Sequence, residues 1–105
     1  MDKNQLNIEI QTFLTKCKEL KKPVKEYCLN EAYPGDSSTS YFFDLKADWI
    51  DEGDCFDAIN FFTEIMFGTM SEGARRKIFS IRVFTDQEEL HCDSGEIHQV
   101  SKKSA

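Results

Sequence analysis

The sequence predicts an α+β fold: a small, single-domain antiparallel sheet of about four strands with two main helices on one face, in the order α-β-β-α-β-β. Three observations predict this fold. Apolar residues recur every three or four positions in two segments, they alternate with polar residues in others, and turn-forming residues separate these segments. The 105 residues, 40% of them hydrophobic, suit one domain spanning residues 1–105.

The first helix is expected over residues 4–21. Its apolar face has the spacing of an amphipathic helix and comprises Leu6, Ile10, Phe13, Leu14, Cys17 and Leu20. Pro23 cannot continue a helix, so the helix should end before it.

Residues 24–29 and 40–50 are expected to form two strands, because β-branched and aromatic residues dominate both. In the second strand, apolar side chains occupy every other position from 41 to 49 and alternate with Asp44 and Lys46. Turn formers fill residues 33–40 and favour a hairpin connection with a mobile tip.

A second helix is expected after Asp54, which should cap the free amides at its start, and Gly68 should end it. Its apolar face comprises Cys55, Ala58, Ile59, Phe62, Ile65 and Met66. Phe56 and Phe67 point away from that face. Either the helix is buried on two sides, which is the preferred reading for a single domain, or the two rings belong to a contact surface.

The remaining residues predict a short helical turn and two more strands. Ser71 should cap the turn, and a strand should follow over residues 78–85 with Phe79, Ile81 and Val83 on one face. A last hairpin is predicted from segments 89–92 and 96–100, and the tail 101–105 should fray.

Acidic residues are concentrated in the later part of the chain. The net charge is −6, and residues 1–43 hold six acids and six bases, whereas residues 44–105 hold thirteen acids and seven bases. The acids form two stretches, between residues 44 and 57 and between residues 86 and 96. Such a field repels nucleic acids and membrane surfaces and attracts cationic partners.

The cysteines contain no C-x-x-C pair, so all four are expected to be reduced and mostly buried; they are Cys17, Cys28, Cys55 and Cys92. Zinc would need clustered ligands, which the spacing does not provide. No apolar run reaches the roughly 20 residues of a membrane-spanning helix, and the N-terminus lacks a signal peptide's apolar stretch. A cytoplasmic location is therefore expected.

Asp44 and Lys46 share one face of the second predicted strand, where an aspartate could hold Mg²⁺ and a lysine could position a water. With Pro34, Gly35 and Asp36 upstream, this stretch resembles the signature of the PD-(D/E)xK nucleases. The resemblance implies a magnesium-dependent nuclease, which the acidic surface disfavours.

His91 and His98 are the only histidines. A two-residue turn at Ser94 and Gly95 would bring them together across the last hairpin, as a site for a metal ion or for pH sensing. A three-residue turn with Gly95 in the left-handed region would separate them and suits the residue types better. The sequence thus assigns no metal-binding residue.

The chain contains no nucleophile elbow and no glycine-rich phosphate loop, so we expect no enzyme activity and no cofactor. The favoured function is protein binding, with a cationic partner such as a toxin domain. In size, charge and lack of catalytic residues, the chain is similar in kind to bacterial immunity proteins that neutralise nuclease toxins. The alternative is a structural or regulatory homodimer joined through Phe56 and Phe67. The predicted partner-binding residues are Asp48, Asp51, Glu52, Asp54, Phe56 and Asp57.

Overall fold

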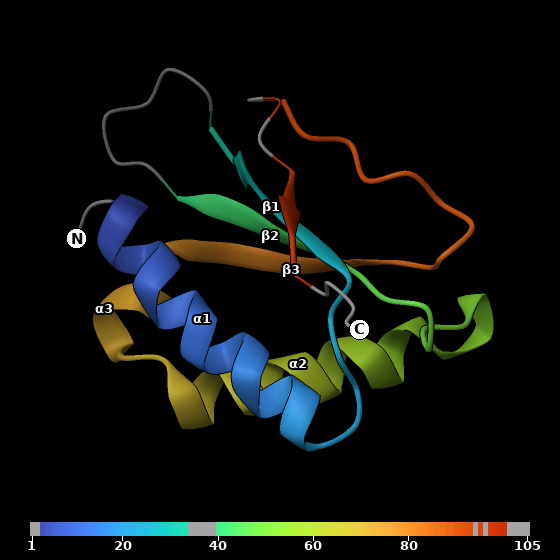
Figure 1. Cartoon of the computed structure of the whole chain (residues 1–105). Helices are drawn as coiled ribbons and strands as arrows, with labels where there is room; N and C mark the ends of the chain where they lie inside the picture. Colours follow the sequence, from blue (N-terminus) through green and yellow to red (C-terminus); the bar gives the residue numbers. More distant parts are fainter. Residues whose placement is uncertain (1–2, 34–39, 94, 96, 101–105) are drawn as a thin grey trace.

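The computed structural model describes residues 3–33, 40–93, 95 and 97–100. One layer is a sheet, and helices α1 and α2 pack side by side on one of its faces (Figure 1). The α+β class, the four strands and the placement of both main helices on one face are confirmed. The elements in chain order are α1 (Lys3–Glu19), β1 (Glu26–Glu31), β2 (Tyr41–Lys46), the 3₁₀ turn η1 (Glu52–Asp54), α2 (Cys55–Thr69), α3 (Glu72–Arg75), β3 (Ile78–Phe84) and β4 (His98–Gln99).

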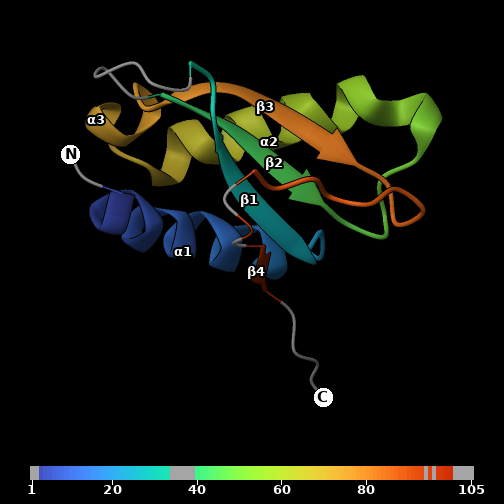
Figure 2. The same ribbon diagram turned by 90° about the horizontal axis from the view of Figure 1, so that it is seen from above.

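The sheet is mixed rather than wholly antiparallel. Its strand order is β3-β2-β1-β4, which Figure 2 shows from above. β1 pairs antiparallel with β2 and with β4, whereas β2 and β3 are parallel. The parallel pair arises because α2 and α3 carry the chain back along the sheet before β3 begins, as a parallel connection requires.

The core lies between the sheet and the two long helices. The ring of Phe13 in α1 lies 5.2 Å from that of Phe43 in β2 and 5.9 Å from that of Phe62 in α2. These three side chains have no exposed surface, so the predicted apolar faces of both helices and of β2 meet where the sequence pattern placed them.

Phe79 departs from the predicted face of β3. The pairing register shifts there, because Tyr41 is opposite Ile78 and Phe42 is opposite Ser80. Phe79 is the extra residue of this irregularity, and it packs against Phe42 at 5.3 Å with 52% of its surface exposed. Its ring therefore leaves the core face that Ile81 occupies.

The helix ends differ in detail from the prediction. The side chain of Asp54 makes no cap hydrogen bond, because η1 leads directly into α2. The main-chain N–H of Asp54 donates to Asp51 O. α2 continues through Gly68 to Thr69. The predicted Ser71 cap is confirmed: its hydroxyl accepts the N–H of Ala74, and both its N–H and its hydroxyl donate to Glu9.

The predicted last hairpin does not form. Residues 89–92 contain no strand, and β4 pairs with β1 instead, with Tyr27 opposite His98. Residues 85–93, here called the strap, cross the sheet face opposite the helices (Figure 1). Gly95 has φ 77° and its N–H bonds to Cys92 O, so the left-handed turn residue is confirmed without its hairpin.

Two predictions, the mobile hairpin tip at residues 34–39 and the frayed tail at residues 101–105, lie outside the described residues. In the part of the chain that the structure describes, none of the helices combines the length and the apolar character that crossing a membrane requires.

Candidate functional site

The predicted partner-binding residues gather at one end of the sheet. Asp48 and Asp51 lie in the loop after β2, Asp54 ends η1, and Phe56 and Asp57 lie in the first turn of α2. All five are exposed, and Phe56 has 83% of its surface accessible. The side chain of Glu52, the sixth predicted residue, lies outside the described part of the structure.

Asp48 and Asp51 line a hollow of about 410 Å³ that we call the acidic hollow. Its other walls include Asp86 and Thr85, from the start of the strap. The two acidic stretches of the sequence therefore meet here, because the strap begins where β3 ends, beside the loop that follows β2. The complete lining is Asp48, Ile50, Asp51, Thr85, Asp86 and Gln87.

Lys25 supplies one positive charge beside the acidic hollow. Its Nζ donates to Asp86 Oδ1 at 2.7 Å, and both side chains are partly exposed. The hydrogen bond and charge of Lys25 hold the pKa of the Asp86 carboxyl below its ordinary value, and Asp86 in turn raises the pKa of Lys25. Asp86 is thus ionised and partly neutralised, whereas Asp48 and Asp51 make no side-chain hydrogen bond or ion pair with the described residues.

The acidic hollow does not gather a set of metal ligands. Among the described residues, no group of three or more His, Cys, Asp or Glu side chains is placed to hold a metal ion. The hollow is suited instead to an extended cation with several hydrogen-bond donors, such as a basic protein side chain.

The strap is joined to β1 by a disulfide between Cys28 and Cys92, so the prediction of four reduced thiols is wrong for this pair. The two cysteines are 64 residues apart, and the long return of the strap over β1 brings their Cα atoms to 5.9 Å. Cys17 and Cys55 are free, as predicted, and burial raises the pKa of the Cys17 thiol to about 12.

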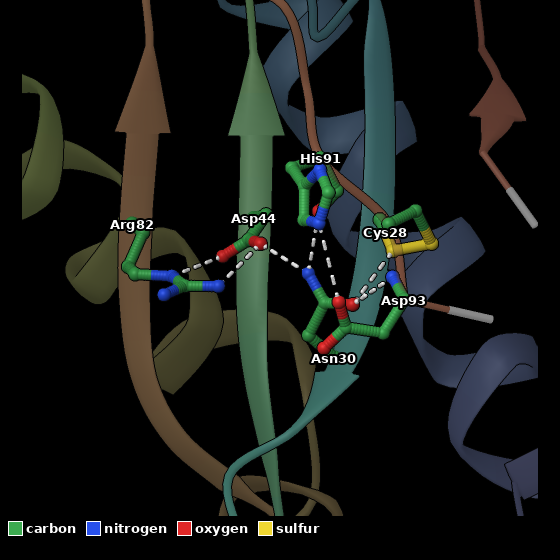
Figure 3. The surroundings of a disulfide bond; sticks show 7 residues. Cys28, Asn30, Asp44, Arg82, His91 and Asp93 are labelled. Atoms are coloured by element: carbon green, nitrogen blue, oxygen red, sulfur yellow. Dashed lines mark hydrogen bonds and ion pairs between the residues drawn. A yellow bond between two sulfur atoms is a disulfide. The ribbon is translucent and has the colours of Figure 1, made fainter. Parts of the chain in front are cut away.

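Asn30 fixes the strap on both sides of Cys92 (Figure 3). Its Nδ2 donates to His91 O at 2.8 Å and to Asp44 Oδ2 at 2.7 Å, and its Oδ1 accepts the N–H of Asp93 at 2.8 Å. The side chain therefore bonds to the strap main chain much as a neighbouring strand would, and all its polar atoms have partners.

Asp44 has no exposed surface and lies between Asn30 and Arg82 (Figure 3). The Nε and Nη2 of Arg82 donate to its two oxygens, each at 2.7 Å, and this bond raises the pKa of the guanidinium. Both carboxylate oxygens thus accept hydrogen bonds from protein donors. Asp44 is a buried, ion-paired carboxylate, and this arrangement gives no support to the nuclease reading of Asp44 and Lys46.

The two histidines do not form a shared site through a hairpin. His98 stacks on the ring of Tyr27 at 4.6 Å, and Tyr27 faces α1, where its hydroxyl donates to Asn7. The His91 carbonyl bonds to Asn30 on the opposite face of the sheet, and its side chain lies 3.4 Å from Asp93. β4 separates them because it pairs with β1 rather than with residues 89–92.

Phe56 and Phe67 are both exposed, so the preferred prediction that α2 is buried on two sides is wrong. The guanidinium of Arg75 lies 4.4 Å from the centre of the Phe67 ring and covers part of it. Phe56, in contrast, stands uncovered beside the acidic residues of η1 and the loop before it.

Sequence reasoning placed Asp86 in an acidic stretch but not in the site, and it missed Thr85 and Lys25. Strand alternation carries no information on which loops meet at a sheet end, so no local signal identified them. No known protein family, curated protein or solved structure matches this chain in the comparisons made.

Proposed function

We propose that the protein is an acidic binding module that inhibits a cationic, nuclease-like toxin by covering its active site or its nucleic-acid groove, as bacterial immunity proteins do. It acts by binding alone and catalyses no reaction. The observation that carries the proposal is the meeting of both acidic stretches at one end of the sheet, around Asp48, Asp51 and Asp86, with the bare ring of Phe56 nearby in the chain.

The physical roles of these groups differ. Exposed carboxylates speed encounter with a basic surface and take the place of nucleic-acid phosphates on it. An aromatic ring that becomes buried at the centre of an interface slows dissociation. Among the described Phe, Tyr and Trp residues, Phe56 is the most exposed, so its burial by a partner would remove the largest fraction of such a ring from water.

The test is capture of the partner from native cell extract by the immobilised protein, at low and at moderate salt, followed by mass spectrometry. The proposal expects a basic protein whose nuclease activity the wild-type protein abolishes at an equimolar ratio. The triple variant Asp51→Lys, Asp54→Lys and Asp57→Lys should weaken this association by at least about a hundredfold.

A control variant carries the same change in net charge elsewhere: Glu19→Lys, Glu31→Lys and Glu64→Lys, all at exposed positions. Its affinity for the partner should stay within about tenfold of the wild-type affinity, because charges farther than a Debye length of roughly 8 Å from the interface are screened. If both variants lose the same affinity for the partner, the end of the sheet that carries the acidic hollow is not the binding surface.

A cytoplasmic location is part of the same proposal, and the Cys28–Cys92 disulfide provides its test. Cytosolic thiols are kept reduced, whereas disulfides persist in oxidising compartments. Alkylation of acid-quenched cells followed by mass spectrometry should find both cysteines reduced if the protein works in the cytoplasm. An oxidised pair in cells would place it in an oxidising compartment instead.

The second candidate is a structural or regulatory homodimer, favoured by the exposure of Phe56 and Phe67 on α2. It predicts a stable dimer that captures no basic protein, which is the opposite of what an inhibitor should show.

A further inference from the structure

Thr85 begins the strap and lines the acidic hollow, with only 6% of its surface exposed. Its main-chain N–H donates to Glu88 Oε1 at 2.9 Å, and its carbonyl accepts the Glu88 N–H at 3.1 Å. Its hydroxyl, in contrast, has no hydrogen-bond partner within the described ranges. A buried hydroxyl without a partner is costly, so a ligand atom that bonded to it would be stabilised.

The free acceptors of the hollow come from two separate segments. The carboxylates of Asp48 and Asp51 lie on the loop after β2, and the Thr85 hydroxyl and Asp86 lie on the strap. Lys25 already occupies Asp86 Oδ1. A ligand that satisfies the remaining acceptors must therefore donate several hydrogen bonds in different directions from one charged group.

A guanidinium group meets this requirement, because it presents five N–H donors fixed in one plane. An ammonium group has its three donors around a single point, and Lys25 already provides one at Asp86. From these contacts we infer that the acidic hollow receives the guanidinium group of an arginine side chain. The inference rests on the proposed function, in which that arginine belongs to the cationic partner.

The first experiment titrates the protein with N-acetyl-arginine amide and follows backbone amide shifts by NMR. We expect saturable shifts confined to residues 48–51 and 85–87. Thr85→Val, which keeps the side-chain shape, should weaken binding by about fivefold, and Thr85→Ser should restore it to within about twofold. The inference is overturned if no localised saturation occurs, or if Thr85→Val binds like wild type.

A matched pair of charge variants separates a built site from diffuse attraction by the net charge. Asp51→Asn removes one carboxylate of the hollow and should weaken binding of the same probe by about tenfold. Glu64→Gln removes one negative charge in the same way at an exposed acid outside the lining, and its affinity for the probe should stay within about twofold of wild type. Equal effects would overturn the inference.

N-acetyl-lysine amide tests the guanidinium assignment itself. It should bind at least about threefold more weakly than the arginine probe, because it reaches fewer acceptors at once. Binding as tight as, or tighter than, that of the arginine probe would contradict the assignment.

These outcomes are distinguishable from those of the partner capture. If the arginine probe fails while the Asp51, Asp54 and Asp57 reversal still abolishes capture, the hollow is no arginine site and the inhibitor proposal stands. If the probe binds as expected but no basic protein is retained, the guanidinium site stands and the inhibitor proposal fails.

Discussion

Lys21, just beyond the end of α1, has φ 64°, a left-handed conformation that costs a side chain with a Cβ about 1 kcal/mol. The reason is the way α1 ends: the N–H of Lys21 bonds to Lys18 O, and the N–H of Lys22 bonds to Cys17 O. This hydrogen-bond pattern usually has glycine in the left-handed position. Lys21→Gly should therefore raise the free energy of unfolding by about 0.5–1 kcal/mol, measured by urea denaturation.

The control for this prediction is Lys18→Gly, an exposed position inside the last turn of α1. There the backbone is right-handed, so glycine should lower the free energy of unfolding by about 1 kcal/mol. Destabilisation by both variants would mean that Lys21 is not strained.

The buried carboxylate of Asp44 makes a second prediction at the residue scale. Asp44 has no exposed surface in the wild-type protein, and Arg82→Met leaves Asn30 as its one side-chain donor, so the free energy of unfolding should fall by about 3 kcal/mol. The double variant Asp44→Leu with Arg82→Met removes both charges, so its free energy of unfolding should fall less than that of Arg82→Met alone. If the double variant loses as much free energy of unfolding as the two single variants together, the two charges do not stabilise each other, and the prediction is wrong.

The strap is the element whose stability depends most on one covalent bond. It has no strand of its own, and Cys28–Cys92 and the side chain of Asn30 hold it to β1. The bond closes a chain segment with a sequence separation of 64 residues, so replacing both cysteines with alanine should lower the free energy of unfolding by about 3 kcal/mol. Amide hydrogen exchange should speed up first in residues 85–93.

Cys55→Ala is the matched control, because Cys55 is a free, half-buried cysteine far from the strap in the chain. It should change the free energy of unfolding by less than about 1 kcal/mol. If the strap amides of the disulfide variant exchange no faster than those of Cys55→Ala, the hydrogen bonds of Asn30 alone suffice to hold the strap.

Elements with a strong local period could be predicted from the sequence. The apolar spacing of α1 and α2 and the alternation around Phe43 gave the right element types, with ends misplaced by one to a few residues. The parallel pairing of β3 and the pairing of β4 with β1 could not be predicted, because register is decided between segments distant in the chain. The same non-local return of the strap hid the disulfide and turned the expected wet face of Asp44 into a buried one.

The candidate site was predictable only where one segment supplied it. Asp48 and Asp51 are exposed, as a charge run before an amphipathic helix suggests. The exposure of Phe56, in contrast, contradicts the preferred prediction of a helix buried on two sides. Thr85 and Asp86 join them through the end of β3, which requires the sheet order to be known. A useful clue was present in Cys28, Asn30 and Arg82, polar or reactive residues within otherwise apolar strands, since such residues on one sheet face often indicate a covering segment.

At the scale of the whole molecule, the exposed rings of α2 bear on self-association. Phe56 and Phe67 are eleven residues apart, which places them about 16 Å apart along the helix axis on one side. Asn60 and Thr63 lie between them on that side, so the two rings do not form one continuous apolar patch. Two copies would also bring together surfaces that share a net charge of −6.

The protein should therefore sediment as a 12.2 kDa monomer at micromolar concentration and physiological salt. High salt screens the repulsion between copies, so a concentration series at about 0.5 M salt is the stricter measurement. A dimer that persisted there and dissociated in Phe67→Ser, but not in Phe79→Ser, would make α2 the interface. Such a result would replace the inhibitor with the homodimer as the function that the exposed rings serve, because a ring buried between copies cannot anchor a toxin.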